Sequence, residues 1–310
     1  VERLIWNEEL GRAFAPEGIN VSGTDLAAPL LLELGTDAQK QAHIPRIVAA
    51  DSVWCQGFSE PESGSDLASL RTRAVKDGDS WVITGEKIWT SYAHVADQCL
   101  LLARTDPEAP PHKGITVFIV PMDAPGLSFR PLRQITGREE FNSLFLDHVV
   151  VPDANVIGTV NAGWQATNET LATERALTRL YRQARFMSEL REIAALLETG
   201  IDGLSHVQAG YFRRRLSEIF CDLYVLRLHN IALAKQVAAG ERIGAESSMI
   251  KLHWSEVHQD LAELAFEICG KDALTFNSRS ETARRYFGIY LQSRAETIYA
   301  GTSQIQRNIL

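Results

Sequence analysis

The chain has 310 residues, of which 45% are hydrophobic and 23% are charged, and its mean hydropathy is -0.10. This length accommodates about two domains, and the composition is that of an ordinary water-soluble globular protein. The formal net charge of -8 argues against nucleic-acid binding, and no apolar run approaches the ~20 residues of a membrane span.

Residues 1–50 have a helical pattern. Leucines recur at helical spacing as far as Leu34, Gly35 interrupts the run, and the pattern resumes from Ala38 to Ala50. No signal peptide is visible, and the chain begins at Val1 inside a helical pattern. We therefore expect residues 1–50 to be a partial N-terminal helical domain that lacks earlier residues.

Residues 51–153 have the pattern of an antiparallel all-β domain. Short runs rich in Val, Ile, Phe, Trp and Thr alternate with turn residues, and Thr84-Gly85 has the composition of a hairpin turn. The seven expected strands are 53–58, 70–75, 81–84, 87–90, 98–103, 115–120 and 143–151. We expect them to form a β-barrel-like domain.

Residues 154–310 return to helical periodicity and predict a four-helix bundle. The clearest helix carries apolar residues at alternating spacings of four and three from Phe212 to Val237, with Asn230 as the single polar member of this seam. Further helices are expected near 177–190, 245–269 and 280–298.

The cysteines and histidines do not suggest a metal site. The four cysteines lie far apart without a Cys-x-x-Cys pair, so neither a zinc site nor a disulfide framework is expected, and a reducing cytoplasm fits best. His253 and His258 are five residues apart and do not share a helix face as paired ligands would.

The last thirteen residues predict a helix start that could bind an anion. Ser303 and Gln306 have the spacing of a capping box, which places backbone N–H donors at an exposed helix end. Gly301 permits close approach of the backbone to a ligand, and Thr302 and Gln304 add side-chain donors. These features suit a phosphate or pyrophosphate, although most capping boxes only begin helices.

Three runs, in this order along the chain, carry a resemblance to a known family. Residues 58–67 read Phe-Ser-Glu-Pro-Glu-Ser-Gly-Ser-Asp-Leu, residues 85–91 read Gly-Glu-Lys-Ile-Trp-Thr-Ser, and residues 301–307 read Gly-Thr-Ser-Gln-Ile-Gln-Arg. With these runs the chain resembles the acyl-CoA dehydrogenase flavoproteins over nearly its whole length. The resemblance implies an α+β fold with an N-terminal helical region, a central antiparallel β-barrel domain and a C-terminal four-helix bundle.

The resemblance implies that FAD is the cofactor and assigns contacts to the two β motifs. Phe58 and Ser59 match residues at the pyrimidine edge of the flavin, and Ser65 matches a residue near the flavin and CoA. Trp89 matches the aromatic residue over one flavin face, and Ser91 matches the hydroxyl near flavin N5. Without the resemblance, a strand tryptophan is usually a core residue and a serine after a strand usually closes a turn.

Further FAD contacts are implied in the C-terminal part, with two departures from the family pattern. Thr302 and Gln304 match cofactor contacts, and Glu267 and Gly270 are the expected contacts on the adenine side, where the usual Gly-Gly turn reads Cys-Gly-Lys. The usual Arg-x-x-Phe-Gly stretch has no match between 199 and 216. Residues 213–215 are three arginines that either replace it electrostatically or are solvated.

The chain lacks the catalytic glutamate at its most common position in the family, and the resemblance implies a base elsewhere. Many family members have a glutamate immediately before Gly-Thr-Ser, where this chain has Ala300. Another branch, which includes isovaleryl- and long-chain acyl-CoA dehydrogenases, has the glutamate on a bundle helix before an arginine, and Glu174-Arg175 stands at that place. Glu174 is therefore the candidate base, with a solvated helix charge as the alternative.

Substrate contacts are implied around the same residues. The backbone N–H of Ala300 matches the donor to the thioester oxygen, while Arg175, Tyr299 and Gly301, with Ser65, are expected near the substrate. The alternative role for Arg175 is a salt bridge on the helix, and that for Tyr299 is an aromatic residue of the core.

Three functions remain open at this point. The leading one is oxidation of an acyl-CoA to the 2-enoyl-CoA, in which Glu174 takes the α proton, flavin N5 takes the β hydride, and an electron-transfer flavoprotein takes the electrons. The second is a non-catalytic or flavin-poor subunit of a heterotetramer, which Ala300 would mark. The third is a flavin oxidase or monooxygenase. A homotetramer or heterotetramer is expected because the FAD site of the family is shared between subunits.

Overall fold

The computed structural model describes residues 2–16, 18–167, 180–198, 205–241, 243–275 and 277–310. By their internal packing the residues form two compact units, one of residues 1–16 and 172–310 and the other of residues 17–171. These units are defined by internal packing alone. The domain limits expected at residues 50 and 153 therefore stay a prediction. None of the helices in the described ranges has the length and apolar composition that a membrane crossing requires.

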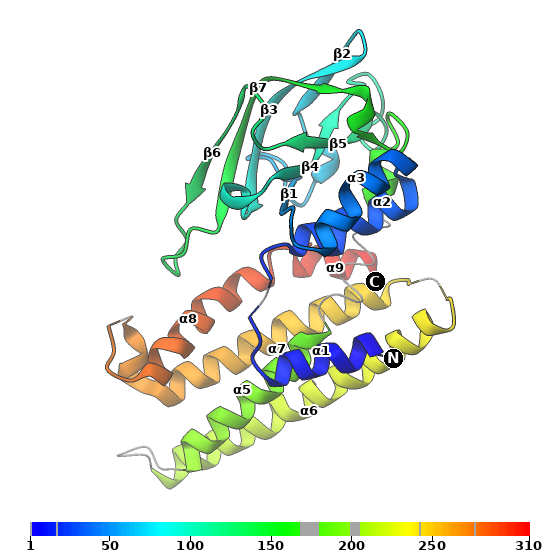
Figure 1. Ribbon diagram of the computed structural model, residues 1–310. Coiled ribbons are helices and arrows are strands. Elements are labelled where there is room, and N and C mark those ends of the chain that lie inside the picture. The colour runs from blue at the N-terminus through cyan, green and yellow to red at the C-terminus, as the bar shows by residue number, and fades with distance from the viewer. Residues whose placement is uncertain (1, 17, 168–179, 199–204, 242, 276) are drawn as a thin grey trace. The chain divides into compact units, whose positions relative to one another are not determined.

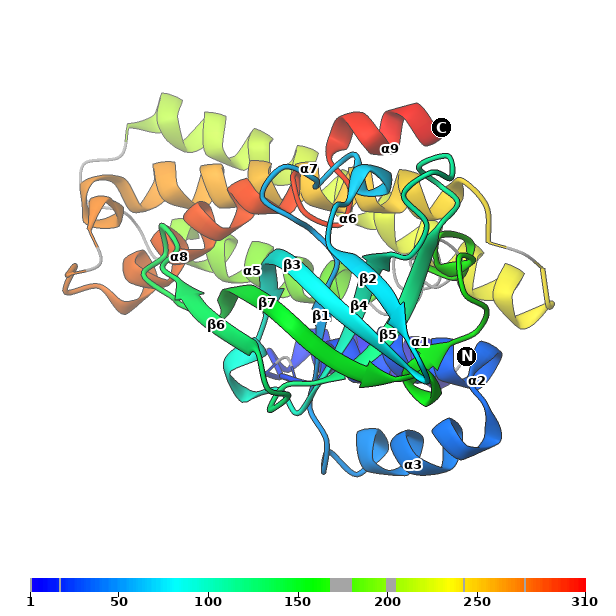
Figure 2. The same ribbon diagram turned by 90° about the horizontal axis from the view of Figure 1, so that it is seen from above.

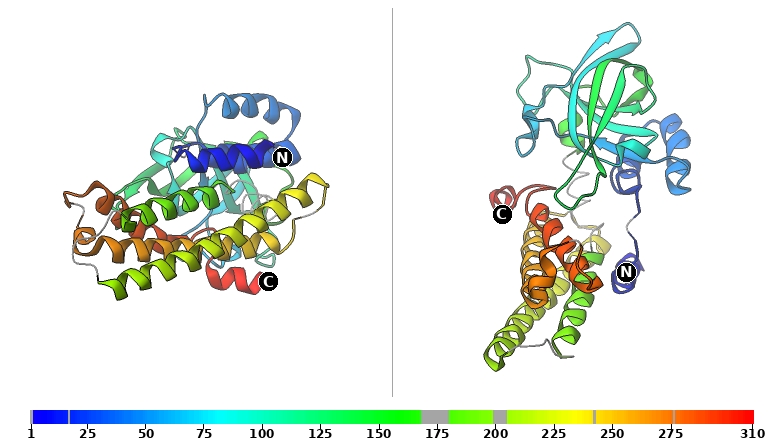
Figure 3. Two further views of the ribbon diagram at one scale, coloured as in Figure 1. Left: turned by 90° about the horizontal axis from the view of Figure 1, so that it is seen from below. Right: turned by 90° about the vertical axis from the view of Figure 1, so that its left-hand side faces the viewer.

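The first fifty residues are helical, as predicted. Helix α1 (Glu2–Arg12) packs along α5 within the first unit, where Figures 1 and 3 show the two helices side by side. A π-helical turn (Gly23–Ala27), α2 (Ala28–Leu34) and α3 (Asp37–Val48) belong to the second unit. Gly35 ends α2, and Thr36 with Gln39 forms a capping box that begins α3.

An eight-stranded sheet is the centre of the second unit, and Figure 2 shows its two longest strands, β3 and β7, running side by side. The strand order is β6-β7-β3-β2-β4-β5-β8, and β1 pairs with β4. Most pairs are antiparallel, but β1 and β2 each run parallel to β4. The strands are β1 (Trp54–Gly57), β2 (Arg73–Asp77), β3 (Ser80–Ser91), β4 (Gln98–Arg104), β5 (Ile115–Pro121), β6 (Leu127–Leu132), β7 (Phe141–Pro152) and β8 (Val156–Ile157).

The predicted hairpin turn at Thr84-Gly85 is wrong. Both halves of β3 pair with the same strand, β7, and the register shifts between Ile83 and Gly85. A Cβ atom at position 85 would lie 2.4 Å from Thr72 Oγ1. Gly85 therefore allows a close approach inside a continuous, irregular strand rather than a reversal of the chain.

Two apolar cores lie in the second unit. One joins Leu30 and Leu31 of α2 to Trp54 of β1 and to residues of β4 and β5. The other contains Trp81, Phe118 and neighbouring residues of β3, β4, β5 and β7. Because apolar residues of β4 and β5 contribute to both cores, these strands read as continuous hydrophobic runs.

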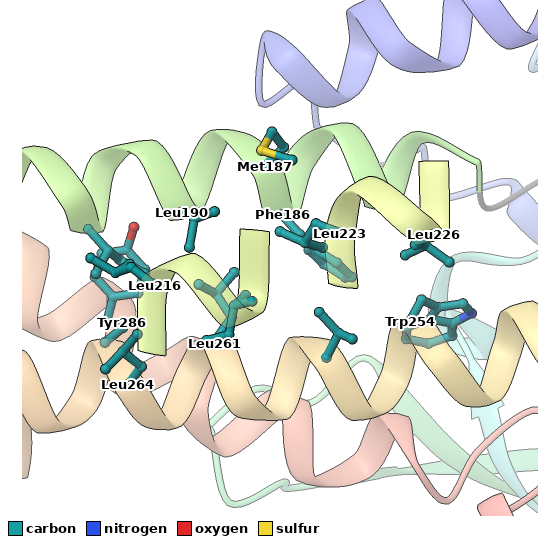
Figure 4. Close-up of a cluster of buried hydrophobic side chains, with 14 of the residues drawn as sticks. Phe186, Met187, Leu190, Leu216, Leu223, Leu226, Trp254, Leu261, Leu264 and Tyr286 are labelled. Atoms are coloured by element: carbon teal, nitrogen blue, oxygen red, sulfur yellow. The ribbon is translucent and has the colours of Figure 1, made fainter. Parts of the chain in front are cut away.

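The four long helices of the first unit are those predicted for the bundle: α5 (Tyr181–Glu198), α6 (His206–Ala238), α7 (Glu246–Cys269) and α8 (Glu281–Glu296). Figure 4 shows side chains of all four helices in one core, among them Phe186, Leu223, Trp254 and Tyr286. The seam predicted for α6 is confirmed from Phe212 to Leu233, including buried Asn230.

Candidate functional site

A buried ion pair connects the two β motifs. Lys87 of β3 is fully buried, and its Nζ donates to Glu60 Oε1 at 2.8 Å and to Phe58 O at 3.1 Å. The N–H of Ile88 donates to Ser59 O at 2.9 Å. The two motifs, about thirty residues apart in sequence, therefore form one structure in which Phe58 and Ser59 lie beside β3.

The ionic state of this pair follows from burial and hydrogen bonding. Glu60 Oε2 and Oε1 accept the N–H groups of Arg71 and Thr72 at 2.6 and 2.8 Å. Burial favours the neutral carboxyl, but Lys87 and these donors outweigh it and lower the pKa of Glu60. Burial also lowers the pKa of Lys87, and the nearby Glu60 carboxylate opposes that change.

Trp89 and Ser91 stand at the end of β3, with Trp89 turned toward solvent. Trp89 has a left-handed backbone (φ 60°), its side chain is 57% exposed, and its ring meets that of Phe141 edge-on at 6.1 Å between centroids. A non-glycine residue in this conformation is strained, and such strain is often found at binding sites. Ser91 is half-buried and is paired with Phe141 in the sheet.

Ser65 lies in an exposed turn within the first β motif, residues 58–67. The turn is closed by the bridge between Glu60 and Ser63 and by a hydrogen bond from Ser63 Oγ to Asp66 O at 2.8 Å. Ser65 is exposed on it. The contact of its hydroxyl with flavin or CoA stays a prediction.

The C-terminal run forms a strained turn followed by α9 (Ser303–Ile309). Ala300 and Gly301 both have left-handed backbones (φ 53° and 87°). Gln306 Nε2 donates to the carbonyls of both residues, at 3.0 and 3.1 Å, and so holds the turn. The Ala300 N–H has no hydrogen-bond acceptor among the described residues.

The predicted capping box at Ser303 and Gln306 is wrong by one residue. Thr302 is the N-cap, because its Oγ1 accepts the N–H of Ile305 at 3.1 Å. Gln306 is then one position too late to complete the box, and its side chain binds the preceding turn instead.

A polar pocket of about 340 Å³ adjoins this helix start. Its lining contains the predicted Thr302 and Gln304, and also Ser303, whose buried Oγ has no partner among the described residues. The remaining lining residues are Glu256, Gln259, Thr297, Ile298 and Arg307, of which Arg307 belongs to the C-terminal motif. Glu256 and Arg307 form an ion pair at 2.5 Å on its wall.

Tyr299 lies on an aromatic and cationic cluster of the bundle. Its ring centroid is 6.4 Å from that of Trp254, and the buried Arg182 guanidinium lies over both rings, 3.9 Å from Trp254 and 5.9 Å from Tyr299. These contacts fix the position of Tyr299, the residue that precedes Ala300. Tyr299 is therefore held by α5 and α7 at the border of the turn.

The other predicted site residues are not part of this pocket. Glu267 and Gly270 are exposed at the C-terminal end of α7, and 11 residues of helix separate Glu267 from Glu256, which corresponds to about 16 Å. Glu174 and Arg175 lie outside the described residues. Of the arginines at 213–215, Arg214 pairs with Glu218 at 2.8 Å.

Two family models of the same protein family match successive parts of the chain. Residues 55–149 match the model of the acyl-CoA dehydrogenase middle domain, and residues 161–310 match that of the acyl-CoA dehydrogenase C-terminal domain. The chain is 39% identical to acyl-CoA dehydrogenase IpdE1 of Mycobacterium tuberculosis over 99% of this chain and 78% of that protein.

Solved structures agree with the sequence matches. The ChsE4-ChsE5 complex of Mycobacterium tuberculosis is similar with a TM-score of 0.88 and 32% identity, over 99% of this chain and 80% of the other. The Tcur3481-Tcur3483 steroid ACAD is similar with a TM-score of 0.86 and 32% identity, over 99% and 78%.

Proposed function

Since this chain belongs to the acyl-CoA dehydrogenase family of FAD-dependent oxidoreductases, we propose that it oxidises an acyl-CoA thioester to the 2-enoyl-CoA with Glu174 as the base. The observation that carries the proposal is the turn at Ala300 and Gly301, which leaves one backbone N–H without an acceptor beside a polar pocket. The sequence from Gly301 to Arg307, which begins in this turn, is one of the three runs that carry the family resemblance.

The residues present fit FAD, which when bound accepts the hydride removed from the β carbon. Trp89 presents an exposed aromatic face from a strained position, which suits a ring that covers the flavin. Beside it, the buried Thr90 Oγ1 and Asn142 Oδ1 have no partner among the described residues. In the other unit, Thr302, Ser303 and Gln304 offer hydroxyl and amide groups to a phosphate.

The base is proposed to be Glu174 because of the family resemblance, in which a glutamate before an arginine on a bundle helix takes this role. Two described carboxylates, one on the pocket wall and one at the end of α8, have other partners. Glu256 is paired with Arg307, and Glu296 lies 2.6 Å from His258. Ala300 has no side chain that could accept a proton. We expect the α proton to pass to a Glu174 carboxylate oxygen, which would act as the general base.

The developing enolate oxygen needs a hydrogen-bond donor, and the Ala300 N–H can supply it. A preorganised backbone donor that meets the charge as it develops lowers the barrier without reorganisation. The left-handed conformation of Ala300, secured by Gln306, keeps this N–H free of intramolecular bonds. Arg175, Tyr299, Gly301 and Ser65 are proposed to contact the substrate.

The test is anaerobic reduction of the bound flavin by acyl-CoA. Glu174→Gln should reduce the rate at least about 10²-fold, the usual contribution of a positioned general base, while flavin content stays unchanged. The exposed Glu198 at the end of α5 provides the matched control, and Glu198→Gln should react at the wild-type rate. Flavin reduction in Glu174→Gln at the wild-type rate would exclude the assignment.

The substrate panel contains straight, branched, aromatic and sterol-derived acyl-CoA thioesters. A sterol-derived thioester is the first choice, because a structure of 32% identity is described as a steroid ACAD. Reoxidation by an electron-transfer flavoprotein, and not by oxygen, is the expected second half-reaction. Rapid oxygen consumption would favour an oxidase instead.

A further inference from the structure

Four charged side chains are buried together between α5, α7 and α8. They are Glu189 of α5, Lys251 and His258 of α7, and Glu296 of α8, and none is more than 6% exposed. Charged groups in a bundle core require close partners, because burial without them is costly. The proposed reaction uses none of these four side chains directly.

His258 lies at the centre of this cluster. Its Nδ1 is 2.6 Å from Glu296 Oε2 and its Nε2 is 3.2 Å from Glu189 Oε2, so both ring nitrogens face carboxylates. Only the imidazolium can donate from both nitrogens. The ring of Phe186 stacks on the imidazole with 3.8 Å between centroids and closes one of its faces.

Two cations and a hydroxyl complete the surroundings of this cluster, and the positive ring depends on the two carboxylates. Arg185 Nε is 3.7 Å from Glu189 Oε1, and Lys251 Nζ donates to Glu296 O at 2.8 Å. Tyr286 Oη is 3.0 Å from Glu192 Oε2 and 3.2 Å from Glu189 O. Burial opposes the charge on His258, but Glu296 and Glu189 outweigh it and raise the pKa of His258 to about 9.

The cluster holds the segment that leads to the proposed donor. Glu296 is the last residue of α8, four residues before Ala300, and both its side chain and its carbonyl are bound by α7. Gln259 Nε2 adds bonds to Ser293 O and Thr297 Oγ1, both at 3.0 Å. The end of α8 is thus attached to α7 immediately before the turn.

We propose that His258, as an imidazolium between Glu189 and Glu296, is a positioning residue that places the turn at Tyr299, Ala300 and Gly301 for catalysis. This inference rests on the proposed function, because the turn matters for rate only if the Ala300 N–H serves the reaction. Misplacement of a catalytic group by about 1 Å can lower a rate about 10²-fold.

The proposal has a defined pH dependence. The pKa of His258 is raised on folding from its usual 6.5 to about 9. The stabilisation of the turn is therefore complete below about pH 6.5 and is lost as the pH rises through about 9. Deprotonation of Glu174 should raise the rate of flavin reduction as the pH rises. Loss of the His258 charge should lower this rate and so produce the falling limb of its pH profile.

The experiment compares His258→Gln with His253→Gln in the FAD-loaded enzyme. His253 is a half-buried histidine on the same helix, and its ring contacts that of His229. His258→Gln should raise amide hydrogen exchange in residues 297–303 and lower the limiting rate of flavin reduction roughly ten- to hundredfold. His253→Gln should change neither quantity.

Glu296→Gln gives a second test that does not depend on His258→Gln folding. Loss of one carboxylate should lower the pKa of His258, so the falling limb of the reduction rate should move to lower pH. An unmoved falling limb, or unchanged exchange in residues 297–303 of His258→Gln, would overturn the proposal. If exchange rises but the rate is unchanged, the positioning role is wrong, whereas full activity of Glu174→Gln would refute only the proposed base.

Discussion

Lys87 is the residue on which the geometry of the two β motifs depends. Its ammonium group is buried without access to water, and it joins the carboxylate of Glu60 to the carbonyl of Phe58. Transfer of both charges from water offsets much of their attraction, so the pair contributes little net stability over an apolar equivalent. Its effect is to fix the position of the residues proposed to meet the flavin.

We predict that Lys87→Met lowers the free energy of unfolding by about 3 kcal/mol or more, because it leaves the Glu60 carboxylate buried without its cation. Flavin content should fall with it. Arg71→Met removes a surface pair with Glu62 at 2.7 Å, whose side chains are 80% and 75% exposed. That control should cost less than about 1 kcal/mol in urea denaturation. Equal losses in the two variants would contradict this account.

Residue by residue, the sequence motifs named candidate contacts but not the residues that support them. Trp89, Thr302 and Gln304 could be named from motifs, and the structure places the last two on one pocket. Lys87 and Glu60 stood in the same motifs, but burial of a charged pair is not visible in a strand pattern. Glu256 and Gln259 lie on α7 far from any motif, so no sequence signal pointed to the pocket wall.

Among the elements, helices were easier to predict than strand limits. The seam of α6 repeats over many turns, so its period identifies it clearly. The irregularity of β3 at Gly85 involves a single position. A glycine there fits a tight turn as well as an irregular strand that approaches Thr72 closely. Strand β6 (Leu127–Leu132) was missed because it is a mostly exposed edge strand that contains Pro131.

Helix packing should reverse the usual effect of a glycine-to-alanine change in α1. Helix propensity alone would make Gly11→Ala stabilising by up to about 1 kcal/mol. A Cβ atom at Gly11 would, however, lie 2.3 Å from Tyr181 O and 2.9 Å from Ala184 Cβ on α5. We therefore predict a net loss of about 1–3 kcal/mol, since α1 must move away from α5.

The matched control for this prediction is Gly210→Ala in α6, where no atom lies within 4 Å of the added methyl group. It should be neutral or stabilising in urea denaturation followed by circular dichroism. Stabilisation of both variants would mean that α1 and α5 tolerate the methyl group.

For the whole molecule, flavin content separates an active enzyme from a flavin-poor partner subunit, and assembly is expected of both. An apolar stripe of Phe220, Tyr224 and Leu228 is exposed on α6, and each side chain is 48–49% exposed. Apolar residues gathered on one helix face are typical of a protein contact. A subunit contact there would agree with the proposed tetramer.

We predict that the purified chain forms a tetramer with close to one FAD per subunit, measured by native mass spectrometry and flavin absorbance. Leu228→Lys should shift the population toward smaller species, because it places a charge in the stripe. A chain with little flavin that gains it only when produced with a second acyl-CoA dehydrogenase chain would support the partner-subunit alternative.

The exposed position of Trp89 has a practical consequence for spectroscopy. Trp54, Trp81 and Trp254 are buried, and Trp6 is the other strongly exposed indole, at 65% against 57% for Trp89. An indole in contact with water emits at longer wavelengths than one in a core, and contact with an isoalloxazine ring quenches its emission. In a Trp6→Phe background, the red edge of intrinsic fluorescence would therefore report occupancy of the flavin site in real time, before any turnover occurs.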